Sequence, residues 1–384
     1  MISTISPLFV TCPRGLENVL AAELTQLNVN NISTQDGGVL CQSDLAGIYR
    51  INLHARTAGR VLLQLAHSAF RSENDIYALS RKIDWQRWFS AEQSFKIRIE
   101  GKHAQINSLN FAALKVKDAL CDYFRDACGQ RPNVDKAAPD IRVYVFIERQ
   151  HVSIYLDSSG EALFKRGYRG DSGDAPMREN LAAGLLLAAG YDGSQAFMDP
   201  FCGSGTIAIE AAWIASRCAP GLNRRFGFEA WRHFDAALWQ DLRHTASKAI
   251  RTASAPIHGS DIDSRLVRMA EDNAANAEVS DLIHWQVCDA IDTRPNGDTG
   301  ILISNPPYGV RLSEIQALHA LYPQLGSWLK QYFSGWLIGM FTADRDMPKL
   351  MRLNPKRKIP LFNGNLDCRL FLLDMVTGSN RNTK

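Results

Sequence analysis

The sequence of 384 residues lacks any segment that could cross a membrane, because no run of about eighteen residues is uninterruptedly apolar. Its first ten residues also lack the basic start, long apolar run and small-residue cleavage site of an export signal. These absences predict a cytoplasmic protein that does not bind a membrane. The length predicts two or three packed domains.

Metal-binding cysteine patterns are absent too. The eight cysteines form no C-x-x-C pair and have no histidines nearby at zinc spacing. We therefore expect reduced, mostly buried thiols and no metal site. The cysteines are Cys12, Cys41, Cys121, Cys128, Cys202, Cys218, Cys288 and Cys368.

The chain has no strong excess of one charge, since it contains 43 Lys and Arg and 40 Asp and Glu residues. The small positive balance lies in residues 1–170, which carry 21 basic and 17 acidic side chains against 22 and 23 in the remainder. This distribution is compatible with a front half that binds nucleic acid, although four charges are weak evidence alone.

The chain contains no internal repeat and no low-complexity tract, and its pattern divides into parts. Short strands and helices alternate over residues 1–55 and again over 56–160, which predicts two small α+β units. The second unit ends in a hairpin formed by residues 141–147 and 152–157. Residues 161–174 are rich in Gly, Asp and Arg and read as a linker.

Residues 175–384 alternate helices with short apolar strands, which predicts βαβ units around a parallel sheet. Near the end, Asn363-Gly364 between two apolar runs predicts a hairpin and hence an antiparallel last strand. The expected strands before that hairpin are residues 196–199, 256–261, 283–288, 301–305 and 336–341.

A glycine-rich motif follows the first of these strands and opens an apolar helix. Glycines at such a turn let the backbone approach a ligand closely. The motif also satisfies G-x-G-x-x-A over residues 203–208, so a dinucleotide-dependent dehydrogenase and a plain strand-to-helix turn remain alternatives at this point. Its residues are Asp199, Pro200, Phe201, Cys202, Gly203, Ser204, Gly205 and Thr206.

An Asn-Pro-Pro-Tyr turn, Asn305, Pro306, Pro307 and Tyr308, directly follows a buried strand, and dehydrogenase chemistry does not need it. The prolines remove two backbone donors and leave the Pro306 carbonyl beside the Asn305 amide oxygen. Two acceptors can hold one exocyclic amine and steer its lone pair towards an electrophilic methyl group. Tyr308 is placed to stack on an extruded base, the alternative being an ordinary proline turn.

Together the two motifs resemble the amino-group methyltransferases that use S-adenosylmethionine. The resemblance implies a cofactor held by the glycine motif, Asn305 and Arg178, with Asp261 and Asp263 at the ribose and Asp289 at the adenine. Each acid could instead be a solvated loop residue or a helix cap, Asp263 above all. Asp261 comes late after the glycines, so residues 218–251 must form an insertion. Its Arg224, Arg225, Trp231 and Arg232 either line an RNA path or anchor a solvated excursion.

The front half resembles a ferredoxin-like unit followed by a THUMP domain. Residues 113–119, 131–135 and 140–143 carry this resemblance. Residues 219–222 and 364–368 extend the resemblance. The whole chain is thus similar to the bacterial large-subunit ribosomal RNA guanine-N2 methyltransferases of the L type. This implies a Rossmann-like α/β domain with a mostly parallel seven-stranded sheet, and RNA contacts at Lys115, Lys117, Arg131, Lys136, Arg166 and Arg169. For Arg166 and Arg169, a solvated basic linker is the competing interpretation.

The family is often fused to a second, N7-guanine methyltransferase, and here only the N2 activity is expected. The predicted function is S-adenosylmethionine-dependent N2-methylation of a guanine in 23S ribosomal RNA. The alternatives are a transfer RNA guanine-N2 methyltransferase, an N6-adenine or N4-cytosine DNA methyltransferase, a protein-glutamine methyltransferase and a non-catalytic ribosome-assembly factor. Ribosomal RNA is the expected partner, and protein partners are not predicted.

Overall fold

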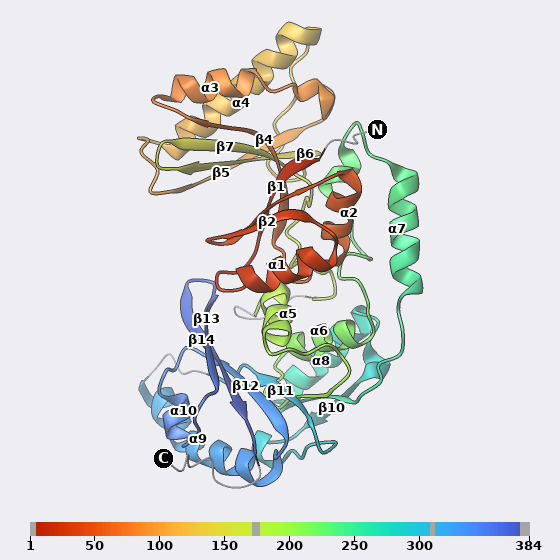
Figure 1. Ribbon diagram of the computed structural model, residues 1–384, viewed down its shortest axis with the longest axis vertical. Helices are drawn as coiled ribbons and strands as arrows, with labels where there is room; N and C mark the ends of the chain where they lie inside the picture. Colours follow the sequence, from red (N-terminus) through yellow and green to blue (C-terminus); the bar gives the residue numbers. More distant parts are fainter. Residues whose placement is uncertain (1–4, 171–176, 308–311, 377–384) are drawn as a thin grey trace. The chain divides into compact units, whose positions relative to one another are not determined.

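A computed structural model describes residues 5–170, 177–307 and 312–376, and the side chains of 312–319 are not part of the description. The chain divides into two compact units that are each assembled from separate segments (Figure 1). Unit 1 comprises residues 1–12, 20–163 and 224–244, and unit 2 comprises 13–19, 164–223 and 245–384. Among the described residues, no helix is long and apolar enough to cross a membrane.

Unit 1 is built on one continuous sheet of seven strands in the order β2-β3-β1-β4-β7-β6-β5. Strand β4 pairs with both β1 and β7, so the two predicted α+β units share a sheet instead of forming separate ones. Helices α3 and α4 pack side by side, and α4 lies against β5 (Figure 1). The elements are β1 Ser6–Thr11, α1 Glu17–Gln26, β2 Asn30–Gln35, β3 Gly38–Ser43, α2 Leu45–His54, β4 Arg60–Ala69, α3 Glu73–Arg81, β5 Phe95–Lys102, α4 Leu109–Cys128, β6 Ile141–Glu148 and β7 His151–Asp157.

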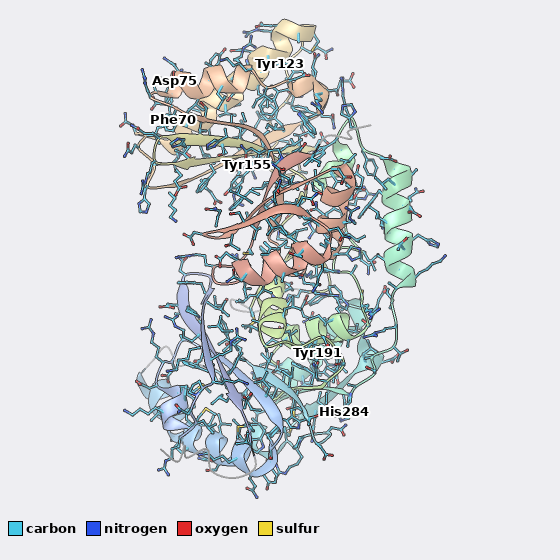
Figure 2. All side chains as sticks on the ribbon, in the orientation of Figure 1. Phe70, Asp75, Tyr123, Tyr155, Tyr191 and His284 are labelled. Atoms are coloured by element: carbon cyan, nitrogen blue, oxygen red, sulfur yellow. The ribbon has the colours of Figure 1, made fainter. Side chains whose placement is uncertain are left out.

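Local sequence explains where the helices of unit 1 start. Asp75, labelled in Figure 2, accepts from the backbone N–H of Ser72 at 3.0 Å and closes a capping box at the start of α3. At the start of α4 the cap residue itself, Ser108, accepts from the Phe111 N–H at 3.2 Å. Gly129 ends α4 with a left-handed φ of 71°.

Part of the predicted insertion belongs to unit 1. The segment 224–244 places Phe228 against Tyr49 of α2, with stacked rings 4.2 Å apart, and Trp231 edge-on to Trp88 at 5.5 Å. The Arg224 guanidinium donates to two backbone carbonyls of unit 1 at 2.6 and 2.9 Å. Aromatic side chains of this segment are therefore packed into unit 1. The segment contains the short helix η2 Gly227–Ala230 and the start of α7 Ala236–Lys248.

Unit 2 contains the predicted α/β sheet, with strand order β10-β9-β8-β11-β12-β14-β13. The first five strands in this order are parallel, and β14 is antiparallel to both neighbours, as predicted for the last strand. The elements are α5 Glu179–Ala188, β8 Ala196–Asp199, α6 Thr206–Ala215, β9 Ile257–Asp261, α8 Ser264–Asn276, β10 Ile283–Val287, β11 Gly300–Ser304, α9 Leu312–Tyr332, β12 Trp336–Thr342, α10 Met347–Leu350, β13 Arg357–Asn363 and β14 Leu366–Asp374.

The core of unit 2 surrounds the central strands. All ten residues of α6 are buried, so this helix lies inside the unit. Tyr191, labelled in Figure 2, is also buried, and its ring packs 5.3 Å from that of Phe197 on β8. The order of strands reverses between β8 and β11: from β8 the chain builds outward through β9 and β10, then returns to β11 on the other side. Such a switch point is where open α/β sheets bind ligands, at the carboxyl ends of the strands.

In the segment 165–169, expected to belong to a linker, Arg166 and Tyr168 are buried in unit 2, whereas Lys165 and Gly167 are exposed. The Arg166 guanidinium pairs with Glu210 of α6 at 3.2 Å, and the side chains are 1% and 0% exposed. Tyr168 packs edge-on against Trp213 of the same helix at 5.3 Å. The basic side chain of Arg166 thus serves an internal ion pair. Its acidic partner comes from a distant part of the sequence, so the local composition does not reveal the pair.

Candidate active site

The carboxyl ends of β8, β9 and β11 meet through hydrogen bonds at the switch point. The Gly203 N–H donates to the Asp261 carboxylate at 3.0 Å, which joins the glycine loop to the end of β9. The Phe201 N–H donates to the Ser304 hydroxyl at 3.1 Å, which joins the same loop to the end of β11. The two sequence motifs, about a hundred residues apart, therefore form one site.

Glycine is required in the loop for two different reasons. Gly205 has a φ of 83°, and a Cβ there would lie 2.8 Å from both Ala270 and Trp285. Gly203 has a φ of 53°, and a Cβ there would meet no described atom within 4 Å. Gly205 therefore lets α6 pack against α8, whereas Gly203 borders open space that a ligand could fill.

Two buried oxygen atoms at this site have no hydrogen-bond partner among the described residues: Asp199 Oδ2 and Asn305 Oδ1. The other oxygen of Asp199 accepts from the Ser304 hydroxyl and, at 3.3 Å, from the Phe201 N–H. Burial raises the pKa of the Asp199 carboxyl to about 7. Buried acceptors are normally satisfied, so two unpaired ones beside an open loop indicate a place for a ligand that carries N–H or O–H donors.

The remaining predicted cofactor residues have differing roles. Asp289 caps the short helix η4 Ala290–Asp292 and accepts from the Ile291 N–H at 3.2 Å. Asp263 caps α8 and pairs with Arg265 at 2.7 Å, and hydrogen bonds from Arg265 lower its pKa to about 2. Arg178 precedes α5 and is exposed, with its guanidinium 4.8 Å from the centre of the Phe164 ring. The geometry of Asp263 is that of a helix cap.

In the Asn-Pro-Pro-Tyr turn, Pro306 is buried and Pro307 is exposed, while Tyr308 lies outside the described residues. Two residues that support the site were not identified from the sequence. Ser304 precedes the turn, and Asn273 of α8 donates to the Ser204 carbonyl at 2.9 Å. A serine or asparagine gives no distinctive pattern, so only the folded arrangement identifies them.

The candidate RNA-binding residues fall into two groups. Arg166 is buried, and Arg169 bonds to the Met177 carbonyl and the Thr206 hydroxyl and pairs with Glu179 at 3.4 Å. Both guanidinium groups are engaged inside unit 2, so the expectation that they contact RNA is corrected to a structural role. The other four lie on unit 1. Lys115 donates to Asn74 at 3.1 Å, Lys117 pairs with Asp118 at 2.7 Å, and Arg131 and Lys136 are exposed.

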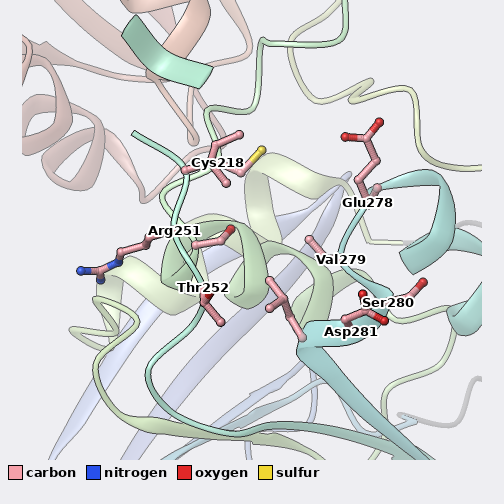
Figure 3. A pocket seen from close by; sticks show the side chains of 11 residues that line it. Cys218, Arg251, Thr252, Glu278, Val279, Ser280 and Asp281 are labelled. Atoms are coloured by element: carbon pink, nitrogen blue, oxygen red, sulfur yellow. The ribbon is translucent and has the colours of Figure 1, made fainter. Parts of the chain in front are cut away.

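A cavity of about 630 Å³ lies elsewhere in unit 2, between the carboxyl ends of α6 and α8 (Figure 3). Its lining includes Cys218, Arg251, Thr252, Glu278 and Asp281. Because helices α6 and α8 end at the amino edge of the sheet, this cavity is remote from Asp199 and Asn305. Within the described part of the chain, no group of three or more His, Cys, Asp or Glu residues is placed to hold a metal ion, and none of the eight cysteines forms a disulfide bond.

Comparison with known proteins agrees with this geometry. Residues 166–371 match the model of the RMKL-like methyltransferase domain, which is more than half of the chain. The chain belongs to this family. Residues 70–157 match the THUMP domain, and residues 7–62 match the RlmL ferredoxin-like domain.

Among relatives of this RMKL-like chain, the ribosomal RNA large subunit methyltransferase K/L of Shewanella baltica (strain OS195) is 39% identical over 97% of the chain. The match covers 54% of that protein, so the chain spans about half the length of the curated relatives it matches. A possible methylase from Clostridium difficile 630 is 32% identical, with a TM-score of 0.91 over 98% of this chain and 100% of that one. SMU.472, crystallised as a complex with SAH, is 27% identical, with a TM-score of 0.90 over 98% and 100%.

Proposed function

We propose that this protein transfers a methyl group from S-adenosylmethionine to the exocyclic N2 amine of a guanine in large-subunit ribosomal RNA. The observation that carries the proposal is the Asn305 amide oxygen, buried and unpaired on a turn that adjoins the glycine loop at the switch point. An amine is the substrate group whose N–H such an oxygen can accept.

The residues present fit S-adenosylmethionine. Open space at Gly203 and the unpaired Asp199 Oδ2 offer room and an acceptor, and SMU.472, with the same overall fold, was crystallised with SAH. The loop from Asp199 to Thr206 would hold the cofactor together with Asp261, Asp263, Asp289 and Arg178. The cofactor supplies an electrophilic methyl group when bound.

The chain itself contributes positioning and polarisation. Asn305 Oδ1 and the Pro306 carbonyl would each accept one N–H of the guanine amine, which turns the nitrogen lone pair out of the base plane. Tyr308 is proposed to stack on the extruded base. No general base is needed before attack, because the product ammonium loses its proton readily.

Ribosomal RNA is favoured as the substrate because the K/L relatives are named for it and because a THUMP domain precedes the methyltransferase domain. Lys115, Lys117, Arg131 and Lys136 are the proposed phosphate contacts on unit 1. Since this substrate is made and assembled in the cytoplasm of bacteria, we expect the protein to act there.

The test is transfer of radiolabelled methyl to ribosomal and transfer RNA from a strain that lacks the gene, followed by nucleoside analysis. We expect N2-methylguanosine in large-subunit RNA. Label in transfer RNA would overturn the proposed substrate, and N6-methyladenosine would overturn the proposed target atom. The absence of label in any nucleic acid would favour a protein substrate or an assembly factor.

The Asn305→Ala variant tests the role of the acceptor turn. We expect its single-turnover rate at saturating cofactor to fall by about 10²–10³-fold, the range for loss of one oriented polar group at a reacting centre. Binding of S-adenosylhomocysteine, measured by calorimetry, should change much less. A wild-type rate in this variant, with the cofactor bound, would exclude the proposed role.

A further inference from the structure

The carboxyl ends of β8 and β11, the two strands at the switch point, are joined through one side chain that the sequence motifs do not include. Ser304 is the last residue of β11 and is 0% exposed. Its hydroxyl donates to Asp199 Oδ1 at the end of β8 and accepts from the Phe201 N–H in the glycine loop. The next residue along the chain is Asn305.

We propose that Ser304 is a positioning residue that acts through Asp199 and sets the glycine loop in register with the Asn-Pro-Pro turn. This inference rests on the proposed function, since it assigns the loop to the cofactor and the turn to the amine. The hydroxyl itself contacts neither.

The hydrogen-bond geometry of the carboxylate supports this role. Asp199 has two oxygens that a rotation about χ2 would exchange, and Ser304 binds only Oδ1. This contact leaves Oδ2 as the buried, unpaired acceptor. Removal of the hydroxyl would free the carboxylate to rotate and would leave the Phe201 N–H with only its longer contact, 3.3 Å to Asp199. A bridge of this kind would therefore affect both ligand binding and the placement of the next residue, Asn305.

The protonation of Asp199 supplies a signature that a purely structural serine would not give. Burial has the largest effect on the pKa of Asp199 and raises it, as does the Asp261 carboxylate, whereas the hydrogen bonds from Ser304 and from the Phe201 N–H lower it. Loss of the hydroxyl should therefore raise that pKa further. A ligand that needs the ionised carboxylate would then bind only at a higher pH.

The experiment compares Ser304→Ala with the wild-type protein. Calorimetry with S-adenosylhomocysteine between pH 5.5 and 8.5 measures binding, and single-turnover methylation of RNA at saturating cofactor measures the chemical step. We expect binding at pH 7 to weaken by about ten-fold, as for a hydrogen bond to a charged group, the pH midpoint to rise, and the saturated rate to fall as well.

Two variants separate this role from general destabilisation. Ser304→Thr restores the hydroxyl and should restore the pH midpoint, even if its added methyl lowers the melting temperature. Ser216→Ala removes a hydroxyl of similar burial, 3% exposed, that bonds only within the end of α6, and should leave binding unchanged. A double-mutant cycle with Asp199→Asn should show that the two changes are not additive.

The inference is overturned if Ser304→Ala binds S-adenosylhomocysteine with the wild-type affinity and pH midpoint, or if the cycle is additive. Failure of the wild type to bind S-adenosylhomocysteine would overturn the proposed function instead. The two failures are therefore distinguishable.

Discussion

Asp199 changes its charge near neutral pH, because burial raises the pKa of its carboxyl to about 7. In the free protein the neutral form stabilises the fold, and this contribution is present at acid pH and is lost as the pH rises through about 7. A cofactor that donates to Oδ2 would reverse the preference by favouring the carboxylate. We therefore expect the affinity for S-adenosylhomocysteine to increase between pH 6 and pH 8.

Calorimetric titrations at several pH values test this prediction, with Asp199→Asn as the control. The amide cannot titrate, so its affinity should be lower and nearly independent of pH. An equal pH slope in the two proteins would assign the titration to another group.

Gly203 and Gly205 make contrasting predictions within one loop. Gly205→Ala forces a Cβ to within 2.8 Å of Ala270 and Trp285 at a φ of 83°, so it should destabilise unit 2 by about 1–3 kcal/mol. Gly203→Ala adds its methyl to open space, so strain at a φ of 53°, about 1 kcal/mol, is its main cost. The methyl group of Gly203→Ala would, however, lie in the space proposed for the cofactor and would obstruct its binding.

Urea unfolding and calorimetry on both variants distinguish the two effects. Gly205→Ala should show the larger loss of stability, and Gly203→Ala should show the larger loss of affinity per unit of stability lost. The same ratio of effects in both variants would mean that Gly203 does not border the cofactor.

At the scale of elements, the sequence predicts those strands and helices that carry their own periodic signal. Strands β8, β11 and β12 of unit 2 are short apolar runs, and both site motifs directly follow such runs. Strand β2 carries no such signal, because Asn30–Gln35 is polar and exposed, with only Ile32 partly buried. Its pairing with β3 at the sheet edge is what makes it a strand. Arg166 was misassigned because Glu210 lies 44 residues away, and no local pattern connects them.

The segment 224–244 is an element of the methyltransferase sequence that stabilises unit 1. Phe228 is 0% exposed and packs against Tyr49 and against Trp239 of α7, with ring centres 4.2 and 5.1 Å apart. Phe228→Ala should therefore lower the free energy of unfolding by about 3–5 kcal/mol. Because these contacts lie within unit 1, hydrogen exchange should quicken there first.

Exchange measured by mass spectrometry tests this prediction, and the exposed His233 in the same segment provides the control variant, His233→Ala. The control should leave the exchange pattern unchanged. Faster exchange confined to unit 2 in Phe228→Ala would contradict the assignment of this segment.

Over the whole molecule, neither unit is one continuous piece of chain, since residues 13–19 belong to unit 2 although strand β1 of unit 1 immediately precedes them. Leu16 in this short segment is 0% exposed and packs so closely on Gly184 of α5 that a Cβ there would lie 2.1 Å from Leu16 Cδ1. Gly15, in the same segment, packs just as closely against the backbone of Pro360 in β13. The start of the chain thus completes the core beside a helix that follows Arg178.

Leu16→Ala should therefore act on unit 2, at a distance in sequence of more than 160 residues from the helix it supports. We expect a loss of about 2–5 kcal/mol in stability and weaker binding of S-adenosylhomocysteine, because α5 adjoins the proposed cofactor site. Leu20→Ala is the matched control, since Leu20 is also 0% exposed but belongs to unit 1. Calorimetry should show impaired binding only in Leu16→Ala, measured at a temperature where both variants remain folded. Equal impairment in both would mean that the segment 13–19 has no specific effect on the site.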